Sequence, residues 1–212
     1  YCLIPKHSSE AYWEEIEIGA MKAVEARRDF YIDLEIMYYS RLDPHSFIET
    51  YQKCLRQNPD GVILVPTTLE VTRQFTDELH DRNIPFILLD SYMPSLQPLS
   101  FYGQDSIQSG RFAARMLMLI AQKEESIMLM KQTKDGKMAS RQQENREVGF
   151  RHYMEENFPN IKILEVNLPL DEERKRYDHI LEKFFSEHPE VHHCITLNSK
   201  AHIVGKFLLK TH

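Results

Sequence analysis

Short apolar runs alternate with helical periods along most of this chain, and this alternation limits its fold more than any other feature. The runs are typical of β-strands, and they cover residues 1–4, 32–39, 61–65, 85–89, 99–102, 126–130, 161–166 and 193–197. Between most of them, apolar residues recur every three or four positions, as in a helix with one buried face. Strands and helices in this order predict an α/β fold of doubly wound parallel sheets, with helices on both faces.

The helical periods also predict which side chains point into the core. The residues that recur on these faces are Trp13, Ile16, Ala20 and Val24; Phe47, Tyr51 and Leu55; Val71, Phe75 and Leu79; Phe112, Met116 and Ile120; and Tyr177, Leu181 and Phe184. Gly19 and Gly110 lie inside two of these helices, where a glycine costs roughly 1 kcal/mol relative to alanine. We therefore expect both glycines to allow close helix packing.

The alternation fails once, between Asp90 and Leu99. Only "SYMPSLQP" joins the two strands there, and this loop is too short for a crossover helix. Because such a break is typical of a chain that leaves one α/β lobe for another, we expect one lobe over residues 1–103 and a second over 104–212. The second lobe has fewer clear strands than the five or so that such sheets usually contain, so we expect it to be incomplete in this sequence.

Composition excludes several classes of protein. The length of 212 residues allows one or two domains with a real core. The net charge of −6 favours neither nucleic acids nor anionic membranes, so contact with DNA would need another segment. Cys2, Cys54 and Cys194 are sparse and form no CxxC pair, which favours a reducing, cytoplasmic compartment. No apolar run approaches the ~20 residues of a membrane span, and no signal peptide is visible.

Catalytic and metal-binding motifs are not evident. The glycines form neither GxGxxG nor a P-loop, and no GxSxG elbow occurs. The segment "HPEVHHC" brings His188, His192, His193 and Cys194 together in sequence, but it has no second ligand cluster, so we interpret it as structural. We therefore expect no enzyme activity, no metal and no cofactor.

Polar and aromatic residues gather instead after the predicted strands, where open parallel sheets bind their ligands. Three of these residues also have a structural interpretation. Trp13 could be a core residue of its helix, Asp90 could cap the proline loop, and Arg146 could pair on the surface with Glu147 or a neighbouring carboxylate. Several loops that converge on one rim nevertheless predict a ligand-binding crevice. The candidate ligand-binding residues are Lys6, Tyr12, Trp13, Thr67, Asp90, Gln104, Arg146, Ser199 and Lys200.

Five stretches, taken in order, carry a resemblance to a known family. They are "AYWEEIEIGAMKA", "DGVILVPTT", "IPFILLDS", "FYGQDSIQSGRFAARML" and "RQQENREVGFRHYM". This ordered set resembles the type I periplasmic-binding-protein fold and, more narrowly, the effector-binding domain of LacI-type transcriptional regulators. The resemblance implies two lobes that close on a sugar or sugar-like effector and shift a hinge equilibrium. It also implies a homodimer that binds operator DNA through a helix-turn-helix headpiece, which this chain does not contain.

The resemblance also implies roles for single residues. Tyr12 and Trp13 match the aromatic pair that packs on the sugar ring. Asp90 matches the carboxylate that holds ligand hydroxyls, and Arg146 matches the ligand-binding arginine. Gln104 lies where the chain of such proteins crosses the hinge.

One motif departs from the family pattern. Ser199 and Lys200 stand where an Asn-Asp pair is usual, which argues against a neutral pentose or hexose. Together with Lys6 and Arg146, this change hints at an effector that carries a negative charge. Two other readings stay open: an extracytoplasmic sugar-binding protein of a transporter or a periplasmic sensor domain, and an enzyme on a doubly wound fold.

Overall fold

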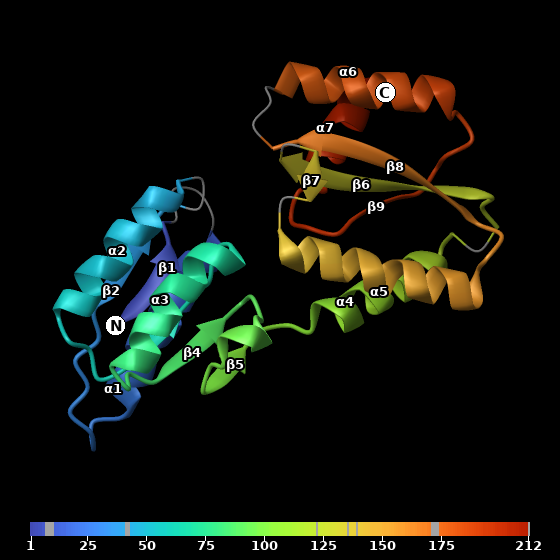
Figure 1. Ribbon diagram of the computed structural model, residues 1–212. Coiled ribbons are helices and arrows are strands. Elements are labelled where there is room, and N and C mark those ends of the chain that lie inside the picture. The colour runs from blue at the N-terminus through green and yellow to red at the C-terminus, as the bar shows by residue number, and fades with distance from the viewer. Residues whose placement is uncertain are drawn as a thin grey trace. The chain divides into compact units, whose positions relative to one another are not determined.

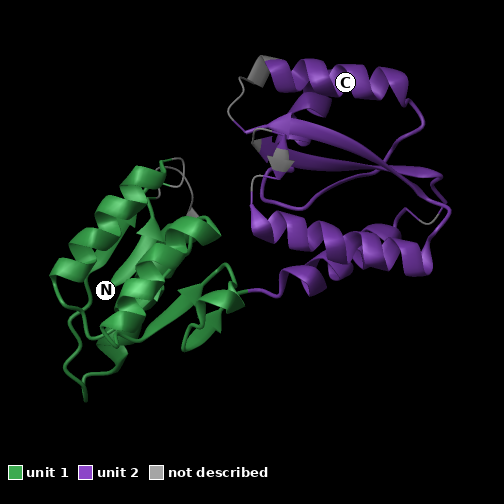
Figure 2. Ribbon diagram, in the orientation of Figure 1, with its two compact units in different colours: residues 1–103 green, residues 104–212 purple. Residues whose placement is uncertain are grey.

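The computed structural model describes residues 1–6, 11–40, 43–121, 123–134, 136–138, 140–170 and 174–211. The chain divides into two compact units, residues 1–103 and residues 104–212 (Figure 2). Each unit contains a mainly parallel sheet with helices on both of its faces (Figure 1). The α/β class expected from the alternating pattern is therefore confirmed.

Unit 1 is a five-stranded parallel sheet in the order β2-β1-β3-β4-β5. Neighbouring residues of β1 point to opposite faces, so Leu3 joins the core under α2 and α3, while Cys2 and Ile4 join the core under α1. The strands are β1 (Cys2–Pro5), β2 (Ile36–Tyr39), β3 (Val62–Leu64), β4 (Phe86–Leu89) and β5 (Ser100–Tyr102). The helices are α1 (Ala11–Ala26), α2 (Pro44–Arg56) and α3 (Leu69–Asp81), and the short 3-10 turn η1 (Pro94–Leu96) precedes β5.

Unit 2 is built around β6, which pairs in parallel with β8 and β9 and antiparallel with the short β7. One face of this sheet packs on α4 and α5, and the other packs on α6 and α7 (Figure 1). The strands are β6 (Ser126–Lys134), β7 (Lys137–Met138), β8 (Lys162–Pro169) and β9 (Cys194–Thr196). The helices are α4 (Ser106–Met118), α5 (Arg141–Asn157), α6 (Arg174–Glu187) and α7 (His202–Thr211).

Polar residues at the helix starts explain several element boundaries. Asp43 accepts a hydrogen bond from a backbone amide of the first turn of α2, and Pro44 follows it at a position that needs no amide proton. Asp105 caps α4 and Ser140 caps α5 in the same way. Asp105, which follows β5 in the sequence, is therefore a helix cap.

Three details of the predicted elements were wrong. Strand β2 begins at Ile36 and not at Ile32, and β7 was not expected. The predicted inward face of α4 was also wrong, because Phe112, Met116 and Ile120 are 62%, 47% and 71% exposed. The physical reason is the neighbouring helix α5, which covers the side of α4 that carries its small residues.

The contact between α4 and α5 explains one of the two helix glycines. A Cβ atom on Gly110 would lie 1.9 Å from the carbonyl oxygen of Arg146, and one on Gly149 would lie 1.9 Å from the carbonyl oxygen of Ile107. The close packing expected at Gly110 is confirmed. The same expectation was wrong for Gly19, because a Cβ there would meet nothing within 4 Å.

Candidate functional site

Asp90 follows β4 in unit 1 and has an unusual backbone. Its φ of 65° lies in the left-handed region, which non-glycine residues seldom adopt. Its amide donates a hydrogen bond to the carbonyl oxygen of Tyr102, 2.9 Å away, and its carboxylate accepts one from the hydroxyl of Tyr12 at 2.8 Å. Backbone strain of this kind is found often at binding sites, where the surrounding contacts maintain it.

The two aromatic residues at the start of α1 have different environments. Trp13 is only 3% exposed and packs with Cys2, Ile4 and Val65, whereas Tyr12 is 53% exposed. The edge of one ring meets the face of the other, with centroids 4.8 Å apart. The structure thus supports the core reading of Trp13, because so little of its ring is left to face a ligand. Tyr12 is an exposed aromatic side chain beside Asp90.

Lys6 and Thr67 follow β1 and β3, two neighbouring strands of the same sheet. Lys6 is exposed and its amide donates to the carbonyl oxygen of Tyr39, 2.7 Å away. Thr67 is half-buried and its amide donates to the hydroxyl of Thr72 at 3.1 Å. Both residues therefore stand at the strand end of the sheet that also carries Asp90.

Arg146, on α5 of unit 2, connects two separate segments. Its guanidinium donates one hydrogen bond to the carbonyl oxygen of Leu197, 3.1 Å away, and another to Oε1 of Gln104, 3.3 Å away. The alternative pairing with Glu147 is not what the structure shows, because Glu147 contacts Lys131 and Arg151 instead. Arg146 thus holds the exposed Gln104, at the entry of unit 2, next to the end of β9.

A buried amide network that the sequence analysis missed supports the loop after β9. Oε1 of Gln143 accepts hydrogen bonds from Nδ2 of Asn198 at 2.9 Å and from the amide of Gln132 at 3.2 Å. Oδ1 of Asn198 then accepts from the amide of Lys200 at 2.9 Å. This loop carries Ser199, which is exposed, and Lys200, which is half-buried. The only sequence signal was the position of Asn198 directly before Ser199.

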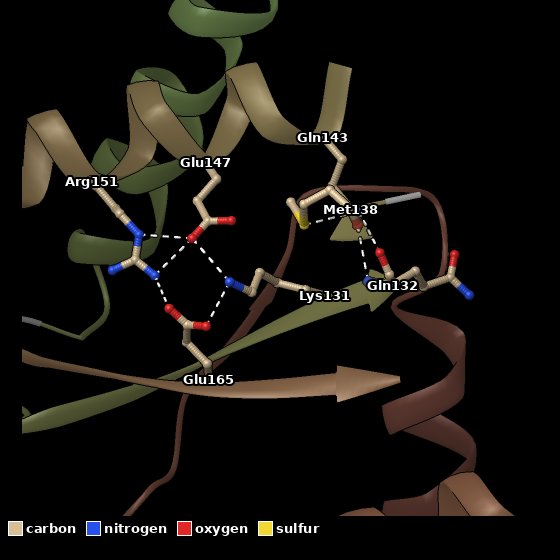
Figure 3. A network of polar contacts seen from close by, with 7 residues as sticks. All are labelled: Lys131, Gln132, Met138, Gln143, Glu147, Arg151 and Glu165. Atoms are coloured by element: carbon tan, nitrogen blue, oxygen red, sulfur yellow. Dashed lines mark hydrogen bonds and ion pairs between the residues drawn. The ribbon is translucent and has the colours of Figure 1, made fainter. Parts of the chain in front are cut away.

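Four charged residues form a second network between α5 and the sheet of unit 2 (Figure 3). Lys131 lies 2.6 Å from Glu165 and 3.2 Å from Glu147, and Nε of Arg151 donates to Glu147 at 2.8 Å. Arg151 also pairs with Glu165. The hydrogen bond from Lys131 is the main cause that holds the pKa of Glu165 below its ordinary value of 4.5. Each charge in this network has a partner, which is typical of a structural role.

A pocket of about 340 Å³ lies in unit 2, at the carboxyl ends of β6 and β8 and the starts of α6 and α7. Lys200, which the sequence predicted as a ligand contact, is one of its lining residues. The pocket was not foreseen, because its walls come from segments far apart in the sequence. Its lining residues are Gln132, Leu170, Tyr177, Asp178, Lys200, His202, Ile203 and Lys206.

The remaining reactive side chains form no further site in the described part of the chain. His192 and His193 both lie near Glu124, at 3.4 Å and 3.3 Å, and no group of three or more His, Cys, Asp or Glu side chains there is arranged to hold a metal ion. Burial raises the pKa of the Cys2 and Cys54 thiols to about 11, which makes them poor nucleophiles. Across the described residues, every helix is too short or too polar to cross a membrane.

Comparison with known families gives one match over the whole chain. The sequence model of the periplasmic binding protein domain matches residues 1–212. A search of curated proteins gives no match.

Several solved structures resemble this one. One is a protein of Bacteroides fragilis that is provisionally described as a LacI transcriptional regulator. It is 44% identical, with a TM-score of 0.87, and the match covers 99% of this chain and 72% of that protein. A periplasmic sugar-binding protein of Legionella pneumophila is 20% identical, with a TM-score of 0.79, and 75% of it is covered by all of this chain. The glucose-galactose binding protein GanP of Geobacillus stearothermophilus is 21% identical, with a TM-score of 0.81, and 72% of it is covered by all of this chain.

Proposed function

The chain belongs to the periplasmic binding protein domain family, and from this premise we propose that it is the effector-binding domain of a LacI-type transcriptional regulator. The effector is a sugar or a sugar-like small molecule. The relative from Bacteroides fragilis supports the regulator, since its similarity extends over nearly all of this chain. The sugar-binding proteins of Legionella pneumophila and Geobacillus stearothermophilus share the fold at 20% and 21% identity, and we propose the ligand class by analogy with them.

The observation that carries this proposal is the Asp90 carboxylate, held beside the exposed ring of Tyr12 on a left-handed backbone. A carboxylate accepts hydrogen bonds from ligand hydroxyls, and the guanidinium of Arg146 donates to ligand oxygens. Hydrogen bonds to charged groups contribute roughly 1.5–3 kcal/mol each. The ring of Tyr12 offers an apolar face to the C–H side of a sugar. Each of these groups suits a small molecule rich in hydroxyls.

Regulation follows if a single effector contacts both Asp90, in unit 1, and Arg146, in unit 2. Such an effector binds one arrangement of the units better than another and shifts the equilibrium by that difference in affinity. In a cytoplasmic homodimer that carries DNA-binding headpieces, the shift changes how the headpieces are held. The DNA contact and the dimer are part of this proposal.

Isothermal titration calorimetry tests the site. Sugars that raise the melting temperature in a thermal-shift screen are titrated into the wild type and into Asp90→Ala and Arg146→Ala. Each variant is expected to bind more than ~10-fold more weakly, because each removes hydrogen bonds to a charged group. Matched controls are Asp60→Ala and Arg28→Ala, two exposed positions outside the candidate site. Unchanged affinity in both site variants would remove the site assignment.

A sugar-binding protein of a transporter, or a periplasmic sensor domain, is the second candidate. The similarity to the Legionella pneumophila and Geobacillus stearothermophilus proteins over most of their length favours it. The coding sequence upstream distinguishes the candidates. A helix-turn-helix there supports the regulator, whereas a signal peptide or a lipid-anchor cysteine supports the binding protein.

A further inference from the structure

We propose that the pocket of unit 2 binds an anionic group of the effector, a phosphate or a carboxylate. This inference rests on the proposed function and deepens it, because it makes the effector a sugar phosphate or a sugar acid. The pocket has about 340 Å³, enough for an anionic group and part of the molecule that carries it. Its walls contain three basic side chains, Lys200, His202 and Lys206.

The acidic group among the described lining residues is already engaged. Asp178 is the acidic residue among the lining residues, and its Oδ2 lies 2.5 Å from the ammonium group of Lys210, which is outside the lining. The charge of Asp178 is therefore balanced by Lys210, and none of the lysines that line the pocket is required for this. His202 and Lys206, which are exposed, are basic side chains of the described wall and suit an anion. Residues 171–173, which follow Leu170, lie outside the described part of the chain.

The second observation is an amide donor in the wall. Gln132 is 6% exposed, and its Oε1 accepts a hydrogen bond from Nδ2 of Asn198 at 3.2 Å. Within the part of the chain that the structure describes, no residue accepts a hydrogen bond from Nε2 of Gln132. This nitrogen is not one of the buried atoms that lack a partner, so it can donate a hydrogen bond to a ligand oxygen at the pocket wall. Phosphate and carboxylate oxygens are acceptors of this kind.

The wall is also held in place before a ligand arrives. The amide of Lys200 donates to Asn198, and Asn198 donates to Gln143, so the loop that carries Lys200 is tied to α5. Gln143 in turn donates to the carbonyl oxygen of Gln132 at 2.9 Å (Figure 3). Ammonium groups bind phosphate as point charges, and charge-assisted hydrogen bonds are the stronger class. A fixed loop keeps this part of the wall in one arrangement when the anion binds.

Inorganic phosphate provides a test that is independent of any sugar. Phosphate is titrated into the labelled chain, and the side-chain amide signals of Gln132 and the ring signals of His202 are followed by NMR. Both should shift and saturate, and Lys206→Gln should weaken binding by about ten-fold through loss of a charged contact. The matched control is Lys162→Gln, an exposed position at the start of β8, which should bind phosphate like the wild type. Absence of these shifts, or equal affinity in Lys206→Gln, overturns the inference.

Three titrations with a hexose 6-phosphate, a hexuronate and the parent hexose separate the two sources of the anion. A response to the first alone identifies a phosphate, and a response to the second identifies a carboxylate. The parent hexose could bind as well as the charged sugars, with binding abolished by Asp90→Ala and unchanged by Lys206→Gln. That result would leave the proposed function intact and refute the anionic pocket. Phosphate that binds in the pocket while no sugar compound binds leaves the pocket intact and refutes the proposed function.

Discussion

The core of unit 1 under α2 and α3 is rich in aromatic rings, whereas the α5 side of the unit 2 sheet contains charges and a close helix crossing. In unit 1, the rings of Tyr51 and Phe75 stack with centroids 5.0 Å apart, and Phe47 meets Phe75 edge-on at 6.2 Å. In unit 2, Lys131 lies between two glutamates, and the helices α4 and α5 meet at Gly110. The same layered architecture thus has two different sources of stability.

This difference teaches which changes each unit tolerates. The stabilisation that comes from burying apolar rings is non-directional and depends little on pH. The stability of such a core should therefore change only gradually with pH and with small changes in side-chain volume. Contact between two helix backbones has no room for one added methyl group. A partly buried ion network also depends on the ionisation of its carboxylates. Unit 2 should therefore be the unit more sensitive to small changes in volume and to acid.

Gly110→Ala is expected to have the largest effect and would sharpen this comparison. The added Cβ would lie 1.9 Å from the carbonyl oxygen of Arg146, so the two helices must separate. Overpacking of this severity should lower the free energy of unfolding by about 3 kcal/mol, measured by chemical denaturation. The control is Gly205→Ala in α7, where the added atom meets nothing within 4 Å. A Gly110→Ala variant as stable as the wild type would contradict the close crossing.

Lys131→Met is expected to have an intermediate effect. It leaves Glu147 and Glu165 without their shared lysine, and removal of one partner from a buried network costs about 3–5 kcal/mol. Because Glu165 is 38% exposed and partly screened, we expect about 2 kcal/mol at pH 7. The matched control is Lys183→Met, a lysine of an exposed pair on α6.

The same network predicts an acid dependence with a definite sign. The pKa of Glu165 in the folded protein is lowered from 4.5, chiefly by its hydrogen bond from Lys131. Its contribution to stability is therefore complete above 4.5 and is lost as the pH falls through the lowered folded value. Denaturation of wild type and Lys131→Met across this range should show a weaker pH dependence in the variant. Parallel curves would mean that Lys131 is not the cause.

Gly19→Ala is expected to have the smallest effect, with the opposite sign. Gly19 lies in α1 of unit 1, and an added Cβ there meets no atom within 4 Å. Alanine restricts the unfolded chain and favours the helix, so the variant should be more stable by about 0.5–1 kcal/mol. A loss of stability at this position would show that α1 has a close neighbour after all, and the contrast with Gly110 would disappear.

The sequence alone determined the class of the fold and the order of its elements. Strand-like runs and helical periods are local patterns, and they record which side of each segment is buried. The positions of Asp90 and Arg146 after predicted strands followed from the same patterns, because parallel strands carry their ligand residues at one end. The departure at Lys200 was also visible, and Lys200 lines the pocket of unit 2.

Only the tertiary structure decided which of two apolar faces of α4 is buried. Phe112 and Met116 are the larger residues, but α5 packs against Gly110, since small residues let two backbones approach. The amide network from Gln143 to Asn198 was equally hidden. Its partners are far apart in the sequence, and the pairing of their hydrogen bonds depends on distances that a periodic pattern does not contain.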